Sequence, residues 1–339
     1  MNCIRLLKDW TLPSAMGLGT LTYLLFAFTP QLAGASRFFA PIMATVLPWF
    51  MFLVLFVTFC KVDFEKLRPV AWHLRVTVLQ LLLIALLIVP FAGQHPACGS
   101  WHLSPTAAVL LEATLMCVVS PCATAAAVVT QKLGGSLEQM TTFTFLSNFL
   151  TALLVPVCFP LIEPSAHVSF LAAFLKILHE VVLVLIVPML LAYVVKHHMK
   201  GLHRRIVGTK DLSFYLWACS LMIVTGTTVR NIVHAQASVW LLGAIAVLSL
   251  VVCVLQFVAG RRAGRSSGHA QEAGQALGQK NTVFAIWLSA AYLHPLSSVG
   301  PGCYILWQNI INSIEIWQNI KHTFGQPRTN SATTDKRRS

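Results

Sequence analysis

Long runs of apolar residues, separated by short polar stretches, make up most of the chain between residues 12 and 317. A helix that crosses a bilayer needs roughly 20 mostly apolar residues. By that measure the pattern predicts an all-α integral membrane protein. Its ten predicted spans lie near residues 12–31, 41–60, 72–92, 106–133, 137–162, 168–195, 212–231, 236–259, 269–292 and 296–317.

The fourth and ninth spans contain residues that interrupt a helix. The fourth contains the run Pro121–Ala127, and the ninth contains the run Leu277–Thr282 with Gly278. Proline removes a backbone donor and glycine loosens a helix. Irregular backbone at bilayer depth survives only where it is buried in protein or lines a wet cavity. Two such breaks at matching places in two halves of a chain indicate the binding site of a transporter.

The ten spans divide into two sets of five, with one break in the fourth span of each set. Because five is odd, the second set begins on the opposite face of the membrane, so the two repeats have inverted topology. We therefore predict a first repeat over residues 1–162 and a second over residues 163–320. Residues 321–339 are predicted to form a disordered cytoplasmic tail.

Lysine and arginine are concentrated in alternate loops and in the tail. The basic stretches are residues 61–68, 196–210, 261–265 and 321–338, whereas residues 93–105 and 293–296 contain no lysine or arginine. Because cytoplasmic loops are enriched in these residues, both termini are predicted to be cytoplasmic, in a plasma (bacterial inner) membrane. The net charge of +13 then reflects topology and contact with anionic lipid headgroups, and binding to nucleic acid is not expected.

Composition excludes a soluble protein and gives no sign of an enzyme. Only 10% of residues are charged and the mean hydropathy is +0.72, whereas soluble domains carry about 25% charged residues. The nine cysteines form no CxxC pair and lie mostly in apolar runs, so neither a disulfide framework nor a metal site is indicated. No Ser-His-Asp arrangement, HExxH helix or nucleotide loop is present, so we expect no enzymatic activity.

Three stretches carry a resemblance to a known family. They are Val62–Phe64 followed by Gln80, the run Pro121–Pro156, and the run Ala276–Thr282. In these stretches the chain resembles the bile acid:sodium symporters (BASS/SBF) and their bacterial relatives, as a divergent member. The resemblance implies a panel of segments 1, 2, 6 and 7 and a core of segments 3–5 and 8–10, in which the two broken helices cross. It also implies alternating-access transport of an organic anion of the bile-acid, steroid or small-carboxylate type.

The sodium ligands that this resemblance implies are largely replaced. In the family, one sodium site uses a Ser-Asn pair after the first break, Ser and Thr on helix five, and Glu on helix nine. A second site uses a Gln on helix three together with the Glu and Gln of helix nine. The corresponding residues here are Ala126, Ala127, Met140, Thr144 and Ala276 for the first site, and Gln80, Ala276 and Lys280 for the second.

Methyl groups and a thioether cannot supply the oxygen ligands that a hard cation takes. The ammonium group of Lys280 would repel a cation and could occupy its place. We therefore predict a sodium-independent transporter that needs no cofactor, with bound sodium disfavoured.

Thr124 and Asn281 are the candidate substrate-binding residues. Each follows a break, where the resemblance implies the substrate cavity and where the start of a half-helix offers partial positive charge to an anion. Lys280 and Glu112 are the candidates for ion coupling. For Glu112, a structural hydrogen bond to a neighbouring helix is an equally good interpretation, and for Lys280 the alternative is a structural pair. Lys176 and Glu180 are predicted to pair within the sixth span.

Other functions stay open at this point. One is a sodium- or proton-coupled symporter or antiporter with altered ion sites, although antiporter chemistry favours adjacent buried aspartates. The aspartates here, Asp9, Asp63, Asp211 and Asp335, all lie near ends or in loops. Another is a non-transporting membrane sensor that kept the fold after losing its ion sites.

Overall fold

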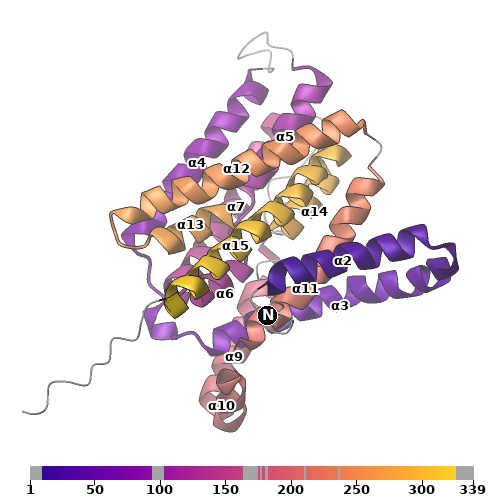
Figure 1. The fold of residues 1–339 in the computed structure, drawn as a ribbon. Helices are drawn as coiled ribbons and strands as arrows, with labels where there is room; N and C mark the ends of the chain where they lie inside the picture. The colour runs from indigo at the N-terminus through magenta and orange to yellow at the C-terminus, as the bar shows by residue number, and fades with distance from the viewer. Residues whose placement is uncertain are drawn as a thin grey trace, which may run out of the picture.

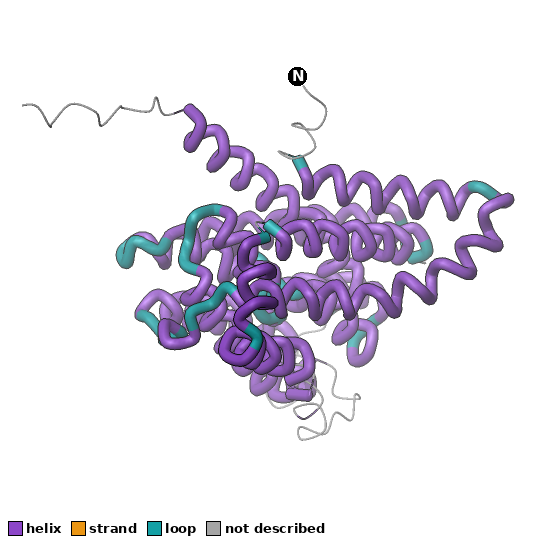
Figure 2. Tube along the Cα trace, turned by 90° about the horizontal axis from the view of Figure 1, so that it is seen from below, coloured by secondary structure: helices purple, strands orange, loops and turns teal. Residues whose placement is uncertain are grey.

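The computed structural model describes residues 10–93, 103–162, 175, 178–179, 182–209, 211–235 and 237–325. Within these ranges the secondary structure is helical, apart from one isolated β-bridge, which confirms the all-α prediction (Figure 2). The elements are α2 (Thr11–Phe28), η1 (Pro30–Leu32), α3 (Ala33–Cys60), η2 (Phe64–Lys66), α4 (Ala71–Ala92), α5 (Pro105–Val119), α6 (Ala125–Lys132), α7 (Leu137–Ile162), the π-helix η3 (Val182–Ile186), α9 (Val187–His198), α10 (Lys200–Gly208), α11 (Leu212–Val233), α12 (Val239–Arg265), α13 (Ala270–Gly278), α14 (Thr282–Tyr292), η4 (Pro295–Ser298) and α15 (Val299–Gly325).

Many of the described helices have the length and composition of membrane spans. Six are long and apolar enough to cross a bilayer: Thr11–Phe28, Pro41–Cys60, Ala71–Ala92, Leu137–Phe159, Leu212–Val233 and Val239–Arg265. Large apolar side chains such as Leu21, Leu86 and Trp240 are exposed on their outer faces, where lipid replaces water as the solvent. The protein is therefore a multi-pass membrane protein, while the count of ten spans and their inverted repeat stay predictions.

Part of the predicted organisation lies outside the described residues. This applies to most of residues 163–181, with Lys176 and Glu180, and to residues 326–339 of the predicted tail. Helix α15 runs on to Gly325, past the predicted end of the last span at residue 317 and past the predicted start of the tail.

The helices form two groups. In the first, α11 packs against α2 and α3, and α3 packs against α9. We call these four helices the panel; α2 and α3 lie toward the right in Figure 1 and α9 lies near the bottom, next to α10, which packs against α9 and α3. The other helices form a larger bundle. In that bundle α12 packs against α5, α13 and α15, and α4 packs against α5 and α7. The grouping agrees with the panel and core that the resemblance implies.

Both predicted helix breaks are confirmed. Helix α5 ends at Val119 and α6 begins at Ala125, so the run containing Pro121 is not helical. Likewise α13 ends at Gly278 and α14 begins at Thr282. The fourth and ninth predicted spans are thus each a pair of half-helices, separated by a few residues of extended or irregular backbone.

Helices α12 and α13 form a tightly packed hairpin. A β-carbon at Gly260 on α12 would lie 2.3 Å from the carbonyl oxygen of Ala273 on α13, and one at Gly274 would lie 2.5 Å from Cγ of Arg261. Real side-chain carbons do not approach other atoms this closely, so glycine at position 260 allows α12 to meet the backbone of α13, and glycine at position 274 leaves room for the side chain of Arg261. The first half of the second broken helix is therefore held against α12.

Candidate functional site

The two breaks lie against each other and satisfy each other's backbone. The N–H of Ala123 donates to the carbonyl oxygen of Gln279 at 2.9 Å, and the N–H of Asn281 donates to the carbonyl oxygen of Pro121 at 2.8 Å. These bonds form a short antiparallel bridge between Cys122 and Lys280. Because unpaired backbone groups are costly away from water, this pairing explains how two unwound segments can persist within the bundle.

Lys280 is buried at this contact, with 1% of its surface exposed. Its Nζ donates to the carbonyl oxygen of Val118 at 3.1 Å, and Nε2 of Gln80 donates to the same oxygen at 3.1 Å. Val118 is in the last turn of α5, where carbonyl groups lack helical partners and carry the partial negative charge of the helix end. The ammonium group of Lys280 therefore sits against a negative helix end, next to the retained Gln80.

The backbone of Lys280 is fixed as well. Its N–H donates to Oε1 of Gln308 at 2.8 Å, and Nε2 of Gln308 donates back to its carbonyl oxygen at 3.2 Å. One side chain of α15 thus satisfies both backbone groups of the residue at the centre of the second break.

The positions predicted to form the first sodium site come together, but as an apolar contact. Ala126, Ala127, Met140 and Ala276 belong to one buried hydrophobic cluster. The remaining oxygen-bearing side chain, Thr144, donates its hydroxyl to the carbonyl oxygen of Met140 on its own helix at 2.9 Å. Thr144 is therefore the one side chain of this set with an oxygen, and packed methyl and thioether groups fill the rest of the space.

A small cavity lies where the two breaks face the panel. Thr124 and Asn281 both line it, so the structure brings the two candidate substrate-binding residues together. The remaining lining residues are Met51, Ala123, Ala125, Trp217, Ser220, Leu221, Val224, Gln279, Lys280, Thr282, Val283, Ile305, Gln308 and Asn309. The cavity volume is about 50 Å³. This is room for a few water molecules, whereas pockets for drug-sized ligands measure roughly 300–1,000 Å³.

Asn281 and Thr124 differ in how they are engaged. Oδ1 of Asn281 accepts a hydrogen bond from the N–H of Phe284 at 3.2 Å, so this side chain caps α14 and its NH₂ is the remaining donor. Thr124 occupies the corresponding position before α6 without making a capping bond. Both half-helices thus begin at the cavity.

Glu112 has structural partners. Its Oε2 accepts hydrogen bonds from the hydroxyl of Ser297 at 2.5 Å and from the N–H of His294 at 3.2 Å. These residues belong to the turn that connects α14 to α15, so Glu112 fixes that turn to α5. This geometry favours the structural interpretation of Glu112 over a role in coupling.

Replacing Glu112 with alanine should therefore mainly lower stability. Losing a charged acceptor for one buried donor, Ser297, and one partly buried donor, the N–H of His294, costs about 1–3 kcal/mol. We expect a lower midpoint of thermal unfolding for Glu112→Ala in detergent, with transport per folded molecule retained. Glu112→Gln keeps an acceptor in place and should be milder. Loss of transport in a stably folded Glu112→Gln variant would instead indicate a coupling role.

Two neighbouring polar residues on α7 make different kinds of contact. Oγ of Ser147 on α7 accepts from the N–H of Cys122 at 2.9 Å and so supports the first break directly. Asn148 donates to the carbonyl oxygen of Thr144 on its own helix at 2.8 Å.

The motif Val62–Phe64 leads into the short helix η2, which begins at Phe64. Asp63 caps this helix by accepting from the N–H of Glu65. A hydrogen bond from Lys66 lowers the pKa of Asp63.

Sequence reasoning missed several side chains that support the breaks. Nε2 of Gln256 on α12 donates to the carbonyl oxygen of Cys117 at 3.1 Å, and the hydroxyl of Thr151 on α7 donates to that of Val119 at 3.2 Å. At the other break, the hydroxyl of Tyr304 donates to the carbonyl oxygen of Gly278 at 2.7 Å. Their one signal in the sequence is a polar residue within an apolar span.

Comparison with known proteins is consistent with this geometry. A family model described as Sodium Bile acid symporter family matches residues 48–259, more than half of the chain. The matched region runs from within α3 to within α12, so it includes the first break and ends before the second. A search among curated proteins gave no match. The family consists of membrane transporters of bile acids and related organic anions. On the extent of this match, the chain belongs to the sodium bile acid symporter family.

Proposed function

We propose that the protein is a secondary transporter of an organic anion that works by alternating access without bound sodium. The observation that carries this proposal is the buried ammonium group of Lys280, which shares the carbonyl oxygen of Val118 with Gln80. In the family that the chain resembles, the residues at this place hold a sodium ion. A covalently attached amine in that place would, when protonated, do the same electrostatic work as the bound sodium ion.

The first sodium site gives independent support. With Ala126, Met140 and Ala276 packed together, the oxygen ligands that sodium needs are missing. Thr144 is the one side chain of this set that still carries an oxygen, and a single hydroxyl does not replace the hydration shell of a cation. The chain has therefore lost the oxygen ligands of the first sodium site and carries a lysine at the second. Both changes are expected for a chain that no longer couples to sodium.

The cavity supports the site of the anion. The two half-helices α6 and α14 both begin there, and helix N-termini carry partial positive charge. With a volume of about 50 Å³, the cavity is closed to a steroid or a similar anion in this conformation. Admission of the anion would therefore require the panel helices α3 and α11 to move away from the two breaks, as alternating access demands.

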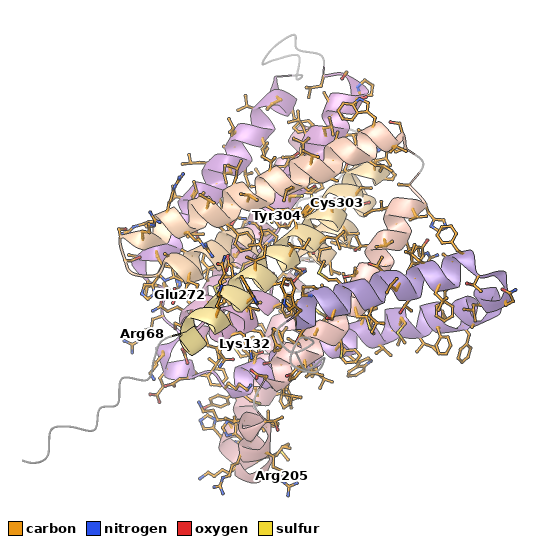
Figure 3. All side chains as sticks on the ribbon, in the orientation of Figure 1. Arg68, Lys132, Arg205, Glu272, Cys303 and Tyr304 are labelled. Atoms are coloured by element: carbon orange, nitrogen blue, oxygen red, sulfur yellow. The ribbon has the colours of Figure 1, made fainter. Side chains whose placement is uncertain are left out.

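The charge distribution supports a cytoplasmic location of the loops at one end of the molecule. Arg68, Lys132 and Arg205 lie toward the same lower end in Figure 3, although they come from three separate parts of the chain. Cytoplasmic loops of membrane proteins are enriched in such residues. We propose that this end faces the cytoplasm of a plasma membrane, and that both termini lie on that side.

Counterflow in proteoliposomes tests the proposed function. We expect vesicles loaded with taurocholate, estrone sulfate or pantoate to take up the labelled form of at least one of them, at the same rate in sodium as in choline. Uptake that requires sodium would contradict sodium independence. Binding without counterflow, measured as a thermal shift with the same anions, would support a sensor in place of a transporter.

A further inference from the structure

A row of polar side chains connects the cavity to the opposite end of α13 and α15. Glu272 and Gln275 on α13 and Gln279, the residue directly after this helix, follow one another at intervals of three or four residues. On α15, Gln308, Asn312 and Glu315 do the same, which places each set on one face of its helix. We call these six side chains the polar seam. It begins at the cavity, where Gln279 and Gln308 both lie.

The seam leads to a buried carboxylate with a cationic partner. Oε1 of Glu315 forms an ion pair with the guanidinium group of Arg261 on α12. Oε2 of Glu315 accepts from Nε2 of Gln275 at 2.9 Å, and the same Nε2 donates to Oδ1 of Asn312 at 3.0 Å. The Glu315 side chain is 8% exposed, whereas that of Arg261 is 44% exposed. One partner of the pair is therefore enclosed, while the other reaches solvent or headgroups.

This arrangement can satisfy Glu315 with or without a proton. In the ionised state, Gln275 donates to the carboxylate, as observed. When a proton binds to a carboxylate oxygen, rotation of the two amides would let Gln275 accept from the new O–H group and from the NH₂ of Asn312. Oε1 of Gln275 and Nδ2 of Asn312, the atoms that would form these bonds, are buried and have no partner among the described residues. Arg261 can lose its anionic partner because its side chain is partly exposed.

The charged groups on neighbouring elements either have other partners or are exposed. Glu272, at the end of the seam on α13, pairs with His269 at 3.4 Å and accepts from the N–H of Ser136. Lys132, on α6, pairs with Asp211 at the start of α11 at 2.8 Å. Two further charged groups have contacts of their own: Glu112 on α5 accepts from the turn before α15, and Lys321 on α15 lies over the ring of Trp317. The others are exposed, namely Arg262 and Arg265 on α12 and Arg230 on α11. Arg261 is thus the ion-pair partner of Glu315.

The pair is also placed to act on the break. Arg261 and Gln275 belong to the α12–α13 hairpin, in which Gly260 meets the backbone of Ala273 and Gly274 lies against the side chain of Arg261. The end of that hairpin is Gln279, whose carbonyl oxygen is bonded to the first break. The ion pair and the amide bond of Glu315 therefore tie α15 to the hairpin that carries half of the site. Loss of the negative charge would weaken this tie.

We propose that Glu315 is the proton-binding group that couples transport of the anion to the proton gradient. This inference rests on the proposed sodium-independent transport. One proton is bound per anion, on the Glu315 carboxylate, and is released to the opposite side of the membrane when the ion pair with Arg261 forms again. No covalent bond other than this O–H bond forms or breaks. The proton passes between the cavity and Glu315 along the part of the polar seam formed by Gln279, Gln308, Gln275 and Asn312, which does not include Glu272.

The experiment separates exchange from accumulation. In proteoliposomes with an imposed pH gradient, the wild type should accumulate the transported anion (taurocholate, estrone sulfate or pantoate) on the alkaline side. One unit of pH supports at most about tenfold accumulation when one proton moves with each anion. Glu315→Gln should retain counterflow but lose gradient-driven accumulation. Glu315→Gln with Arg261→Gln, which leaves no unpaired guanidinium group, should behave in the same way.

Glu272→Gln is the matched control, because it neutralises a carboxylate at the same end of α13 that lies outside the ion pair. It should accumulate the anion as the wild type does. Infrared titration of the purified protein supplies a readout that does not need transport: the C=O band of a protonated carboxyl should appear on acidification in the wild type and be missing in Glu315→Gln. The inference would be overturned if both Glu315 variants accumulated the anion, or if the infrared titration of Glu315→Gln were the same as that of the wild type. Failure of wild-type counterflow would overturn the proposed function instead, and the infrared result would still decide whether Glu315 binds a proton.

Discussion

Lys280→Met is expected to weaken binding and transport of the anion by more than tenfold while leaving the protein folded. Lys280 lines the cavity, so an anion bound there would lie within roughly 8 Å of its ammonium group. At an effective dielectric constant of about 20, such a pair contributes about 2 kcal/mol, which corresponds to about thirtyfold in affinity. Methionine has nearly the same length and no charge to desolvate, so the midpoint of thermal unfolding should change little or rise. The measurements are concentration-dependent counterflow and thermal unfolding.

Lys132→Met provides the matched control for this substitution. It removes the same charge from the same protein, but at the end of α6, where Lys132 pairs with Asp211. We expect it to leave the affinity for the anion close to that of the wild type. Equal affinity in Lys280→Met and in the wild type would show that Lys280 serves only to fill and cap the end of α5.

The breaks could be located from the sequence because their causes are local. A proline in one apolar run and a glycine in another are visible without any knowledge of packing, and the observed breaks fall at Ser120–Thr124 and Gln279–Asn281. The expectation that Thr124 and Asn281 line the same cavity came from the resemblance to the family. That the two breaks would bond through Ala123 and Gln279 could not be read from the sequence, since the bond depends on how the half-helices meet.

The polar seam escaped sequence analysis for a different reason. Glutamine and asparagine in a span are ambiguous, because they serve equally as bonds to their own helix and as bonds between helices. Asn309, for example, donates to the carbonyl oxygen of Ile305 on the same helix. Arg261 and Glu315 each lie near the end of an apolar run, where a charged residue needs no partner to be tolerated. Only the packing of α12, α13 and α15 shows that they meet.

The second prediction with a large effect is that sodium dependence can be restored. Ala276→Glu combined with Lys280→Gln removes the internal cation and supplies a carboxylate and an amide on the second broken helix. Gln80 already lies at the site, and its Oε1 is buried without a partner among the described residues. We expect sodium, and not potassium, to raise the thermal stability of this variant. At about fifteen times its dissociation constant, a ligand specific to the folded state stabilises it by about 1.6 kcal/mol.

The single variants show whether the cation site itself is responsible. In Ala276→Glu alone, the introduced carboxylate should pair with the ammonium group of Lys280, so sodium should have no effect on stability. Lys280→Gln alone keeps the amides of Gln80 and of the new side chain but has no negative charge, and it should respond weakly. Because Ala276 is fully buried among Ala126 and Met140, a further variant adds Met140→Ser, which makes room for the glutamate and supplies an oxygen. A sodium response in the wild type as large as in the double variant would contradict the replacement of sodium by Lys280. A folded double variant without any sodium response would contradict it equally, because the lysine would then not be what excludes the ion.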